Sequence, residues 1–399
     1  MSGSWYRRTY WIAAIEAAWR RRPIVWLAGP RRAGKTVLCQ LLDDVEYFDC
    51  ELPSVRRQLR DPELFWERLR GRRVCLDEVH RLDDPAAVLK IAADHHPSVR
   101  VLATGSSTLG ASARFRDTLA GRREQIWLTP MIEQDLLDFG RPDLERRLVR
   151  GGLPPFFLSD EPLERDVQDW LDAYWAKDLQ ELFRLERRDA FLRLIELLLD
   201  RSGGVFQASR LATECRISHT TVLNYASVLE ATGVIQRIRP YSKRRATEIV
   251  AAPKVYGFDT GFVLLIRGEQ ASPRELGSLW EHFVLNELTA RMWRRRIHYW
   301  RDKRGHEVDF VVPERMGPVA IECKWRADSL DPRNLAAFRR RHPDGLNFVV
   351  APDVRGSWIE RRAGMVIEFV SLAGLIARLE ELGAPADAAG TRGPEEAGP

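Results

Sequence analysis

The 399-residue sequence predicts an α/β protein that begins with a parallel β-sheet covered by helices. Short apolar runs typical of buried strands alternate with helical patterns between residues 24 and 128. The first run leads into a glycine-rich loop, and a later run ends in two adjacent carboxylates. Strands and helices that alternate at these lengths indicate βαβ units, and therefore a parallel sheet with helices on both faces.

The composition is that of a globular protein, with 45% hydrophobic and 30% charged residues. The net charge of +5 is compatible with a nucleic-acid partner but does not require one. The five cysteines show no C-x-x-C spacing, which favours a reducing cytoplasm over disulfides or a zinc site. Because no run reaches the ~18 apolar residues of a membrane span, we expect a cytoplasmic protein without a membrane segment.

The glycine-rich loop has the spacing of a phosphate-binding loop. It follows the apolar run Ile24–Ala28, precedes a helical pattern from Val37, and reads Gly29-Pro30-Arg31-Arg32-Ala33-Gly34-Lys35-Thr36. Its glycines let the backbone curl so that successive N–H groups face the phosphates of a nucleotide. Lys35 adds a positive charge, and the Thr36 hydroxyl is a ligand for Mg²⁺. All eight residues are therefore predicted to bind a nucleoside triphosphate with its Mg²⁺.

Two carboxylates about 40 residues further on complete this site. The apolar run Val74–Leu76 leads directly into Asp77 and Glu78. At the carboxyl end of a buried strand, Asp77 can hold the Mg²⁺ shell, while Glu78 can orient and polarise the attacking water. The pattern predicts hydrolysis of the nucleotide as well as its binding.

Further groups are expected near the γ-phosphate. A hydroxyl after the next strand can sense this phosphate, and the sequence leaves the choice open between Thr104, Ser106 and Ser107, with Ser106 included in the predicted site. Charge that develops on the γ-phosphoryl group also requires an arginine, from the same chain or from a neighbour. We favour Arg122, with Arg123 as the other candidate.

The middle of the chain is predicted to be helical and to contain a helix-turn-helix. An aromatic stripe between Glu164 and Asp200 is interpreted as core packing. In the segment from Gln207 to Ile238, Ser218 can cap a second helix that Gly233 ends. The basic run from Tyr241 to Arg245 is predicted to be a wing that contacts DNA phosphates. Such modules also serve in packing or protein contacts, so this alternative stays open.

Taken together, these motifs resemble prokaryotic AAA-type ATPases in which a P-loop domain precedes a winged-helix segment and a restriction-endonuclease-like domain. The resemblance covers about residues 7 to 375. It rests on the loop, on Leu76-Asp77-Glu78-Val79-His80, on Leu119-Ala120-Gly121-Arg122, on Leu128-Thr129-Pro130 and on Gly151-Gly152-Leu153-Pro154. Family members often carry Gln at the position of His80. The resemblance implies ATP as the nucleotide and a homo-oligomer in which an arginine crosses between subunits.

A second candidate site lies in the C-terminal part. On two predicted strands, Asp309, Glu322 and Lys324 can meet at one sheet edge, because Glu322 and Lys324 point to the same face. Two carboxylates can hold Mg²⁺ while the ammonium positions a water. This resembles the D…E-x-K site of restriction-endonuclease-like nucleases, which implies that Glu281 also contributes to the metal site. Because many such domains bind nucleic acid without cutting it, nuclease activity stays open.

We therefore predict an ATPase domain at 1–140, a helical and winged-helix domain at 141–270, a restriction-endonuclease-like α/β domain at 271–382 and a disordered tail at 383–399. The predicted function is Mg²⁺-dependent ATP hydrolysis that acts on nucleic acid through the winged helix, with a possible nuclease. The alternative is an ATP-gated switch whose C-terminal domain binds DNA or protein without cleavage.

Overall fold

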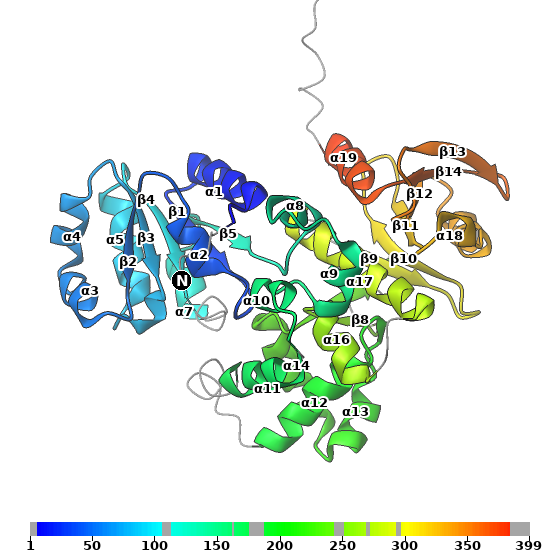
Figure 1. Cartoon of the computed structure of the whole chain (residues 1–399), viewed down its shortest axis with the longest axis horizontal. Coiled ribbons are helices and arrows are strands. Elements are labelled where there is room, and N and C mark those ends of the chain that lie inside the picture. The colour runs from blue at the N-terminus through cyan, green and yellow to red at the C-terminus, as the bar shows by residue number, and fades with distance from the viewer. Residues whose placement is uncertain are drawn as a thin grey trace, which may run out of the picture. The chain divides into compact units, whose positions relative to one another are not determined.

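The computed structural model describes residues 6–105, 113–161, 163–174, 187–242, 251–268, 272–292 and 297–383 (Figure 1). The chain forms two compact units. The first comprises Met1–Arg237 and Ala252–Trp293, and the second comprises Ile238–Ala251 and Arg294–Pro399. No helix in the described ranges is long and apolar enough to cross a membrane.

A parallel sheet begins the first unit. Among the described residues it contains five strands: β1 (Ile24–Ala28), β2 (Val45–Asp49), β3 (Arg73–Asp77), β4 (Arg100–Thr104) and β5 (Arg123–Trp127). Their order is β2-β3-β4-β1-β5, and each neighbouring pair is parallel. All five residues of β1 are buried, as expected for a strand covered on both faces. The predicted α/β class and the parallel sheet are therefore confirmed.

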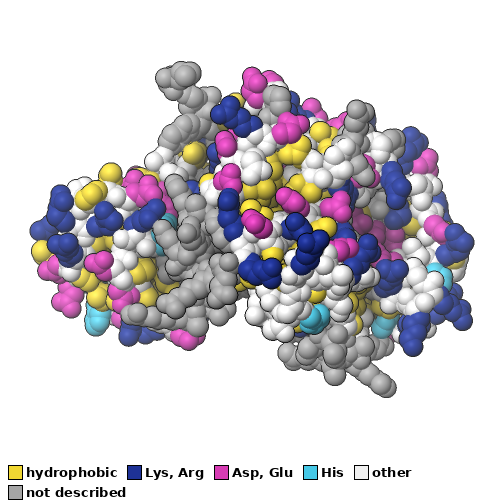
Figure 2. Space-filling model, turned by 90° about the horizontal axis from the view of Figure 1, so that it is seen from below, with side chains coloured by type: hydrophobic (Ala, Val, Ile, Leu, Met, Phe, Trp, Pro, Cys, Tyr) yellow, Lys and Arg dark blue, Asp and Glu magenta, His cyan; other side chains and the backbone are white. Residues whose placement is uncertain are grey.

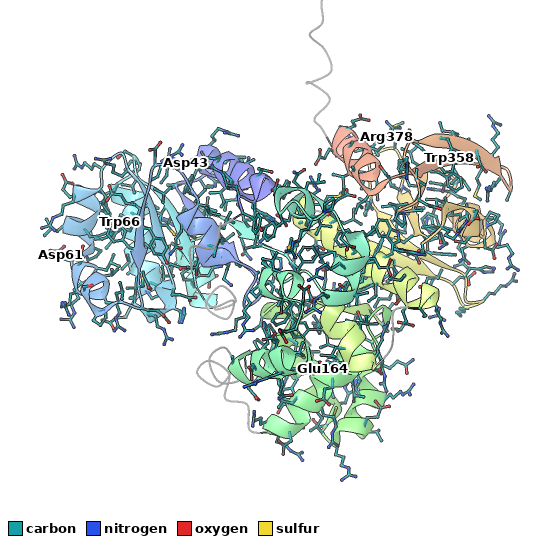
Figure 3. All side chains as sticks on the ribbon, in the orientation of Figure 1. Asp43, Asp61, Trp66, Glu164, Trp358 and Arg378 are labelled. Carbon is teal, nitrogen blue, oxygen red and sulfur yellow. The ribbon has the colours of Figure 1, made fainter. Side chains whose placement is uncertain are left out.

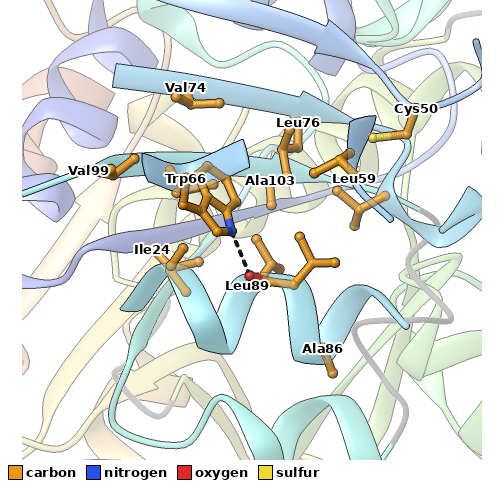
Figure 4. Packing of buried hydrophobic residues seen from close by; sticks show 14 of the residues in the cluster. Ile24, Cys50, Leu59, Trp66, Val74, Leu76, Ala86, Leu89, Val99 and Ala103 are labelled. Carbon is orange, nitrogen blue, oxygen red and sulfur yellow. Dashed lines mark hydrogen bonds between the residues drawn. The ribbon is translucent and has the colours of Figure 1, made fainter. Parts of the chain in front are cut away.

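Short helices accompany this sheet. They are α1 (Thr9–Arg21), α2 (Lys35–Gln40), α3 (Pro53–Gln58), α4 (Pro62–Arg68), the 3₁₀ turn η1 (Val79–Arg81), α5 (Pro85–His95) and α7 (Ala113–Thr118). Helix α4 starts at a proline, and Asp61 caps it by accepting the N–H of Leu64 at 3.0 Å. Trp66 of α4 lies inside the domain, whereas Asp61 lies at its surface (Figure 3). The Trp66 indole N–H donates to the Val88 carbonyl at 3.0 Å within the apolar core (Figure 4).

Helices dominate the rest of the first unit. They are α8 (Glu133–Asp138), α9 (Leu144–Arg150), α10 (Pro154–Leu158), α11 (Leu163–Tyr174), α12 (Arg188–Asp200), α13 (Ala208–Cys215), α14 (His219–Ala231), α16 (Thr260–Arg267) and α17 (Pro273–Arg291). The short strands β6 (Gly204–Val205) and β8 (Lys254–Gly257) pair antiparallel. Ser218 caps α14 through the N–H of Thr221 at 3.0 Å, as predicted. The basic run at 243–245 lies outside the described residues.

The second unit is an α/β domain. Its strands are β9 (His298–Arg301), β10 (Glu307–Val312), β11 (Val319–Cys323), β12 (Asn347–Val350), β13 (Trp358–Arg362) and β14 (Met365–Val370), in the order β13-β14-β12-β11-β10-β9. The Ile238–Pro240 part of β7 (Ile235–Pro240) pairs parallel with β9. Helix α18 (Arg333–Arg341) packs on β10, and α19 (Leu372–Gly383) packs on β12 and β14. The 3₁₀ turn η3 (Ala327–Ser329) follows β11.

Charged side chains of both signs are mixed at the surface. Among the coloured atoms on the face drawn in Figure 2, Lys and Arg side chains are interspersed with Asp and Glu side chains. All five cysteines are buried thiols. The predicted tail lies outside the described residues from position 384 onward.

Candidate functional site

The glycine-rich loop connects β1 to α2. A Cβ atom at Gly29 would lie 2.4 Å from the Leu128 carbonyl oxygen, so only glycine fits there. Gly34 has a φ of +94° and precedes the first residue of α2, a left-handed conformation that glycine adopts without strain. The Lys35 ammonium donates to the carbonyl oxygens of Gly29 and Pro30 at 3.0 and 3.1 Å. The lysine therefore folds back over its own loop.

A cavity of about 840 Å³ lies over this loop, within the first unit. Its polar side includes Lys35 and Thr36 from the loop and Glu78 and His80 from the end of β3 and η1. Its apolar side is formed by Tyr6, Leu38, Leu41, Phe139, Pro154 and Leu158. This volume is in the range of sites that hold drug-sized ligands and cofactors, and the mixed lining suits a ligand with a charged end and an apolar end.

Asp77 lies beside this cavity but is 2% exposed and is not among the described residues that line it. Its carboxylate accepts hydrogen bonds from the Tyr47 hydroxyl at 2.8 Å and from the Thr104 hydroxyl. Burial and the hydrogen bond to Asp77 raise the pKa of Tyr47, so this phenol stays a donor. The Thr104 hydroxyl also accepts the N–H of Glu78 at 3.2 Å. Thr104 thus connects the two adjacent acidic residues, and Tyr47 is a contact that the sequence analysis missed.

Glu78 is one of two glutamates among the described residues that line the cavity, together with Glu51. It has a φ of +55°, a conformation that is uncommon for a non-glycine residue and is concentrated at functional sites. Its carboxylate lies 3.0 Å from the Nδ1 atom of His80. Burial raises the pKa of Glu78, but the contact with His80 and the charges of Lys35 and Arg31 outweigh it and hold the pKa below its ordinary value. Glu78 is therefore ionised at neutral pH.

Two side chains from outside the loop contact its backbone. Arg8 is buried, donates to both carboxylate oxygens of Asp135 at 2.8 and 2.6 Å, and donates to the Ala33 carbonyl at 2.8 Å. The Trp170 indole N–H donates to the Arg31 carbonyl at 3.0 Å. The sequence predicts core packing for the aromatic stripe that contains Trp170 and indicates no role for Arg8. No short motif marks either residue, because their partners lie 139 and 25 positions away.

The remaining residues predicted for this site lie elsewhere or outside the described ranges. Arg122 pairs with Asp94 through two hydrogen bonds of 2.6 and 3.0 Å and is not among the residues that line the cavity. The guanidinium of Arg123 lies over the ring of Phe115 at 5.1 Å. Ser106 and Ser107 fall in the segment 106–112, which the description does not cover, so Thr104 is the candidate hydroxyl whose contacts are defined.

The structure brings Asp309, Glu322 and Lys324 together in the second unit. The Lys324 ammonium lies 2.6 Å from Glu322 and 3.5 Å from Asp309, on the adjacent antiparallel strands β10 and β11. Asp309 also accepts the N–H of Cys323 at 2.8 Å. Burial lowers the pKa of Lys324, but the two carboxylates raise it further, so the net shift is upward and the group stays protonated.

The donor chemistry of this triad suits Mg²⁺, which prefers carboxylate oxygens and usually uses only one or two of them. No cluster of three or more His, Cys, Asp or Glu side chains with metal-site geometry occurs among the described residues. Glu281, the fourth residue predicted here, lies on α17 in the first unit, where it accepts from the Tyr256 hydroxyl at 2.5 Å and from buried Lys254 at 3.2 Å. Its role as a metal ligand stays a prediction.

Known protein families match three successive parts of the chain. A family described as AAA domain matches residues 21–137, and two domains of unknown function, DUF8612 and DUF4143, match residues 141–272 and 276–369. The uncharacterized proteins Rv2008c of Mycobacterium tuberculosis and Mb2031c of Mycobacterium bovis are each 30% identical in an alignment of 326 residues that covers 78% of this chain and 72% of theirs. The Walker-type ATPase PABY2304 of Pyrococcus abyssi is 16% identical, with a TM-score of 0.42, over 66% of this chain and 96% of that chain. The chain therefore carries an AAA domain and belongs to the family of Rv2008c and Mb2031c.

Proposed function

We propose that this protein binds and hydrolyses ATP in the cavity over the phosphate loop. The observation that carries the proposal is that Lys35, Thr36 and the ionised Glu78 line the same 840 Å³ cavity. The match of residues 21–137 to an AAA domain supports it. The apolar side, where Tyr6 and Phe139 stack with ring centroids 4.6 Å apart, suits the base of the nucleotide.

The residues of the loop site have separate tasks in this proposal. Lys35 leaves the carbonyls of Gly29 and Pro30 and neutralises charge on the terminal phosphates. Glu78 orients the attacking water and accepts its proton, while Thr104 holds the Glu78 backbone. Mg²⁺ enters with ATP as part of the substrate, and the oxygen atoms of Thr36 and Asp77 suit it.

The wider proposal is that the ATP state controls how the middle and C-terminal parts hold DNA. Support comes from the two consecutive helices α13 and α14, which have the lengths and cap of a helix-turn-helix. Arg122, which is 34% exposed in its pair with Asp94, is suited to act on a neighbouring subunit in a homo-oligomer. The ranges 1–140, 141–270 and 271–382 remain our proposed domains.

A binding and turnover experiment tests the ATPase. We expect Lys35→Ala to weaken ATP binding by about 100-fold, and Glu78→Gln to keep ATP affinity while hydrolysis falls by about 100-fold. Lys90→Ala, which removes an exposed lysine from α5, is the matched control and should behave as wild type. Wild-type affinity in Lys35→Ala, measured by calorimetric titration, would contradict the proposal.

A second candidate function is Mg²⁺-dependent cleavage of nucleic acid, favoured by the convergence of Asp309, Glu322 and Lys324. The test incubates the protein and Mg²⁺ with branched, single-stranded and duplex DNA. Cleavage that disappears in Asp309→Ala but persists in Asp331→Ala, a surface aspartate paired with Arg333, supports a nuclease. DNA binding without cleavage supports the ATP-gated switch instead.

A further inference from the structure

Side-chain donors form hydrogen bonds with carbonyl oxygens of the phosphate loop. Lys35 donates to Gly29 and Pro30, Trp170 donates to Arg31, and Arg8 donates to Ala33. In a planar trans peptide the C=O of one residue and the N–H of the next point in opposite directions. A donor that holds a loop carbonyl on the outside therefore directs the following N–H toward the inside of the loop, where phosphate would lie.

The donors differ in what happens when a phosphate arrives. Lys35 must leave its two carbonyls to reach the phosphate, whereas Trp170 and Arg8 can stay. The indole of Trp170 is neutral, so it holds the Arg31 peptide without adding charge to the phosphate site. Trp170 also lies outside the AAA domain, in the part of the chain that matches a different family.

The indole of Trp170 is itself held firmly. Trp170 is 1% exposed, and its ring stacks on Tyr174 at 5.2 Å and on Phe258 at 4.9 Å, with interplanar angles of 18° and 17°. The Tyr174 hydroxyl is hydrogen-bonded to the hydroxyl of Thr232, the residue that follows α14. A continuous set of contacts thus leads from the Arg31 carbonyl to the end of the helix-turn-helix.

Resting on the proposed nucleotide site, we propose that Trp170 is a positioning residue whose indole N–H holds the Arg31 peptide, so that helix α11 sets the affinity of the loop for nucleotide. The connection through Tyr174 makes this affinity depend on how α14 is packed. A partner that shifts the packing of α14 would then change nucleotide affinity. By reciprocity, nucleotide binding would shift the packing of α14 by the same coupling free energy.

The full-length variant Trp170→Phe tests the proposal, because it keeps an aromatic ring and removes the N–H. Trp66→Phe is the matched control: its indole also donates to a backbone carbonyl at 3.0 Å and is also buried, but away from the loop. We titrate each protein calorimetrically with ADP and Mg²⁺. Loss of one hydrogen bond that orders the loop should weaken ADP about 3- to 10-fold in Trp170→Phe, and less than about 2-fold in Trp66→Phe.

Two further readouts separate positioning from a general loss of stability. Trp170 and Tyr174 also line the cavity. If the indole acts through the Arg31 peptide and not through contact with the base, the ratio of ADP to GDP affinity should be unchanged in Trp170→Phe. Tyr174→Phe, which keeps the ring stack but loses the bond to Thr232, should weaken ADP in the same direction by a smaller factor. Thermal unfolding of the variants checks that all of them are folded.

The outcomes distinguish this inference from the proposed function. If the wild type binds no ADP, the nucleotide site itself is wrong and the inference falls with it. If the wild type binds ADP but Trp170→Phe binds equally well, or Trp66→Phe loses as much affinity, the nucleotide site stands and the role of Trp170 is refuted. A selective loss in Trp170→Phe supports it.

Discussion

The phosphate loop of the first unit and the triad of the second unit both place a lysine near carboxylates, but with opposite results. Lys35 rests on backbone carbonyls beside a cavity into which the ionised Glu78 also faces. Lys324 is held directly by Glu322 and Asp309. In the triad, two carboxylates hold one ammonium directly, whereas Lys35 donates to carbonyl oxygens of its own loop, and its charge helps to lower the pKa of Glu78. Lys35 can exchange its carbonyl partners for an anionic ligand. Lys324 would leave its two carboxylates only if another cation replaced it.

The two sites also differ in how many parts of the chain build them. The triad needs two neighbouring strands, which a short connection joins. The loop site needs the loop itself, the ends of β3 and β4, and contacts from Arg8 and Trp170. Changes far from the loop in sequence should therefore alter the first site more easily than the second.

The largest effect on stability is expected when the triad loses its cation. Lys324→Met leaves Asp309 and the buried Glu322 without their cation and should destabilise the protein by about 3 kcal/mol. Because the pKa of Lys324 is raised, the wild-type ion pairs are fully present below the ordinary lysine pKa and persist throughout the neutral range.

Chemical unfolding at pH 8 measures this effect, and Lys303→Met, at an exposed lysine of the same unit, is the control. Nucleotide affinity should not change in Lys324→Met. A variant as stable as the wild type at pH 8 would show that the triad charges are not balanced by Lys324.

The next prediction concerns a glycine that packs against a buried carboxylate. Gly151 has a φ of +85°, and a Cβ atom there would lie 2.0 Å from a carboxylate oxygen of buried Asp259, which accepts the N–H of Gly152 at 2.6 Å. Gly151→Ala should destabilise the protein by about 2–3 kcal/mol. Gly140→Ala is the matched control, because Gly140 has a φ of +63° but open space around it, and about 1 kcal/mol is expected. Equal losses in chemical unfolding would contradict the packing argument.

A smaller effect should separate catalysis from binding at the loop site. Thr104→Val keeps the shape of a buried side chain but removes the hydroxyl that donates to Asp77 and accepts the Glu78 N–H. ATP hydrolysis should fall about 10-fold while ATP affinity stays within about 2-fold, since Lys35 is untouched. Steady-state turnover and calorimetric titration measure the two quantities. An equal loss of hydrolysis and affinity would indicate that Thr104 supports only the packing of the site.

The smallest effect concerns a buried carboxylate that is less well compensated than those of the triad. Glu287 on α17 is 1% exposed; burial raises its pKa to about 7, although the nearby Arg291 opposes the shift. Its raised pKa means that its contribution to stability is fully present below about pH 4.5 and is lost as the pH rises through 7. Glu287→Gln, which does not ionise, should therefore gain on the order of 1 kcal/mol relative to wild type between pH 5 and 8. A stability difference that is constant with pH in urea unfolding would contradict this.

Much of the fold could be predicted because its signals are local. The alternation of apolar runs and helical patterns predicted the five parallel strands, and the spacing around Ser218 predicted the start of α14. The two strands predicted to bring Asp309 and Glu322 together also formed. The hairpin of β13 and β14 was not anticipated, because Trp358, Ile359 and Val366 are partly exposed and do not alternate clearly with polar residues.

The candidate site was predictable only in part, because only some of its residues belong to local sequence motifs. The loop and Glu78 stand out in the sequence because they are contiguous motifs with fixed spacing. Tyr47, Arg8 and Trp170 carry no such motif, and their contacts depend on packing between elements far apart in the chain. The pairing of Arg122 with Asp94 is likewise a tertiary result that sequence spacing does not encode.

Local sequence is sufficient to predict the α/β class, the curl of the loop at Gly29 and Gly34, and the shared face of Glu322 and Lys324. These properties follow from backbone freedom and from the periodicity of neighbouring residues, which act over a few positions. The donors that hold the loop carbonyls, and the connection of Asp77 to Glu78 through Thr104, depend on tertiary packing. Hydrogen bonds between distant elements exist only once those elements have packed, so their partners cannot be read from local order.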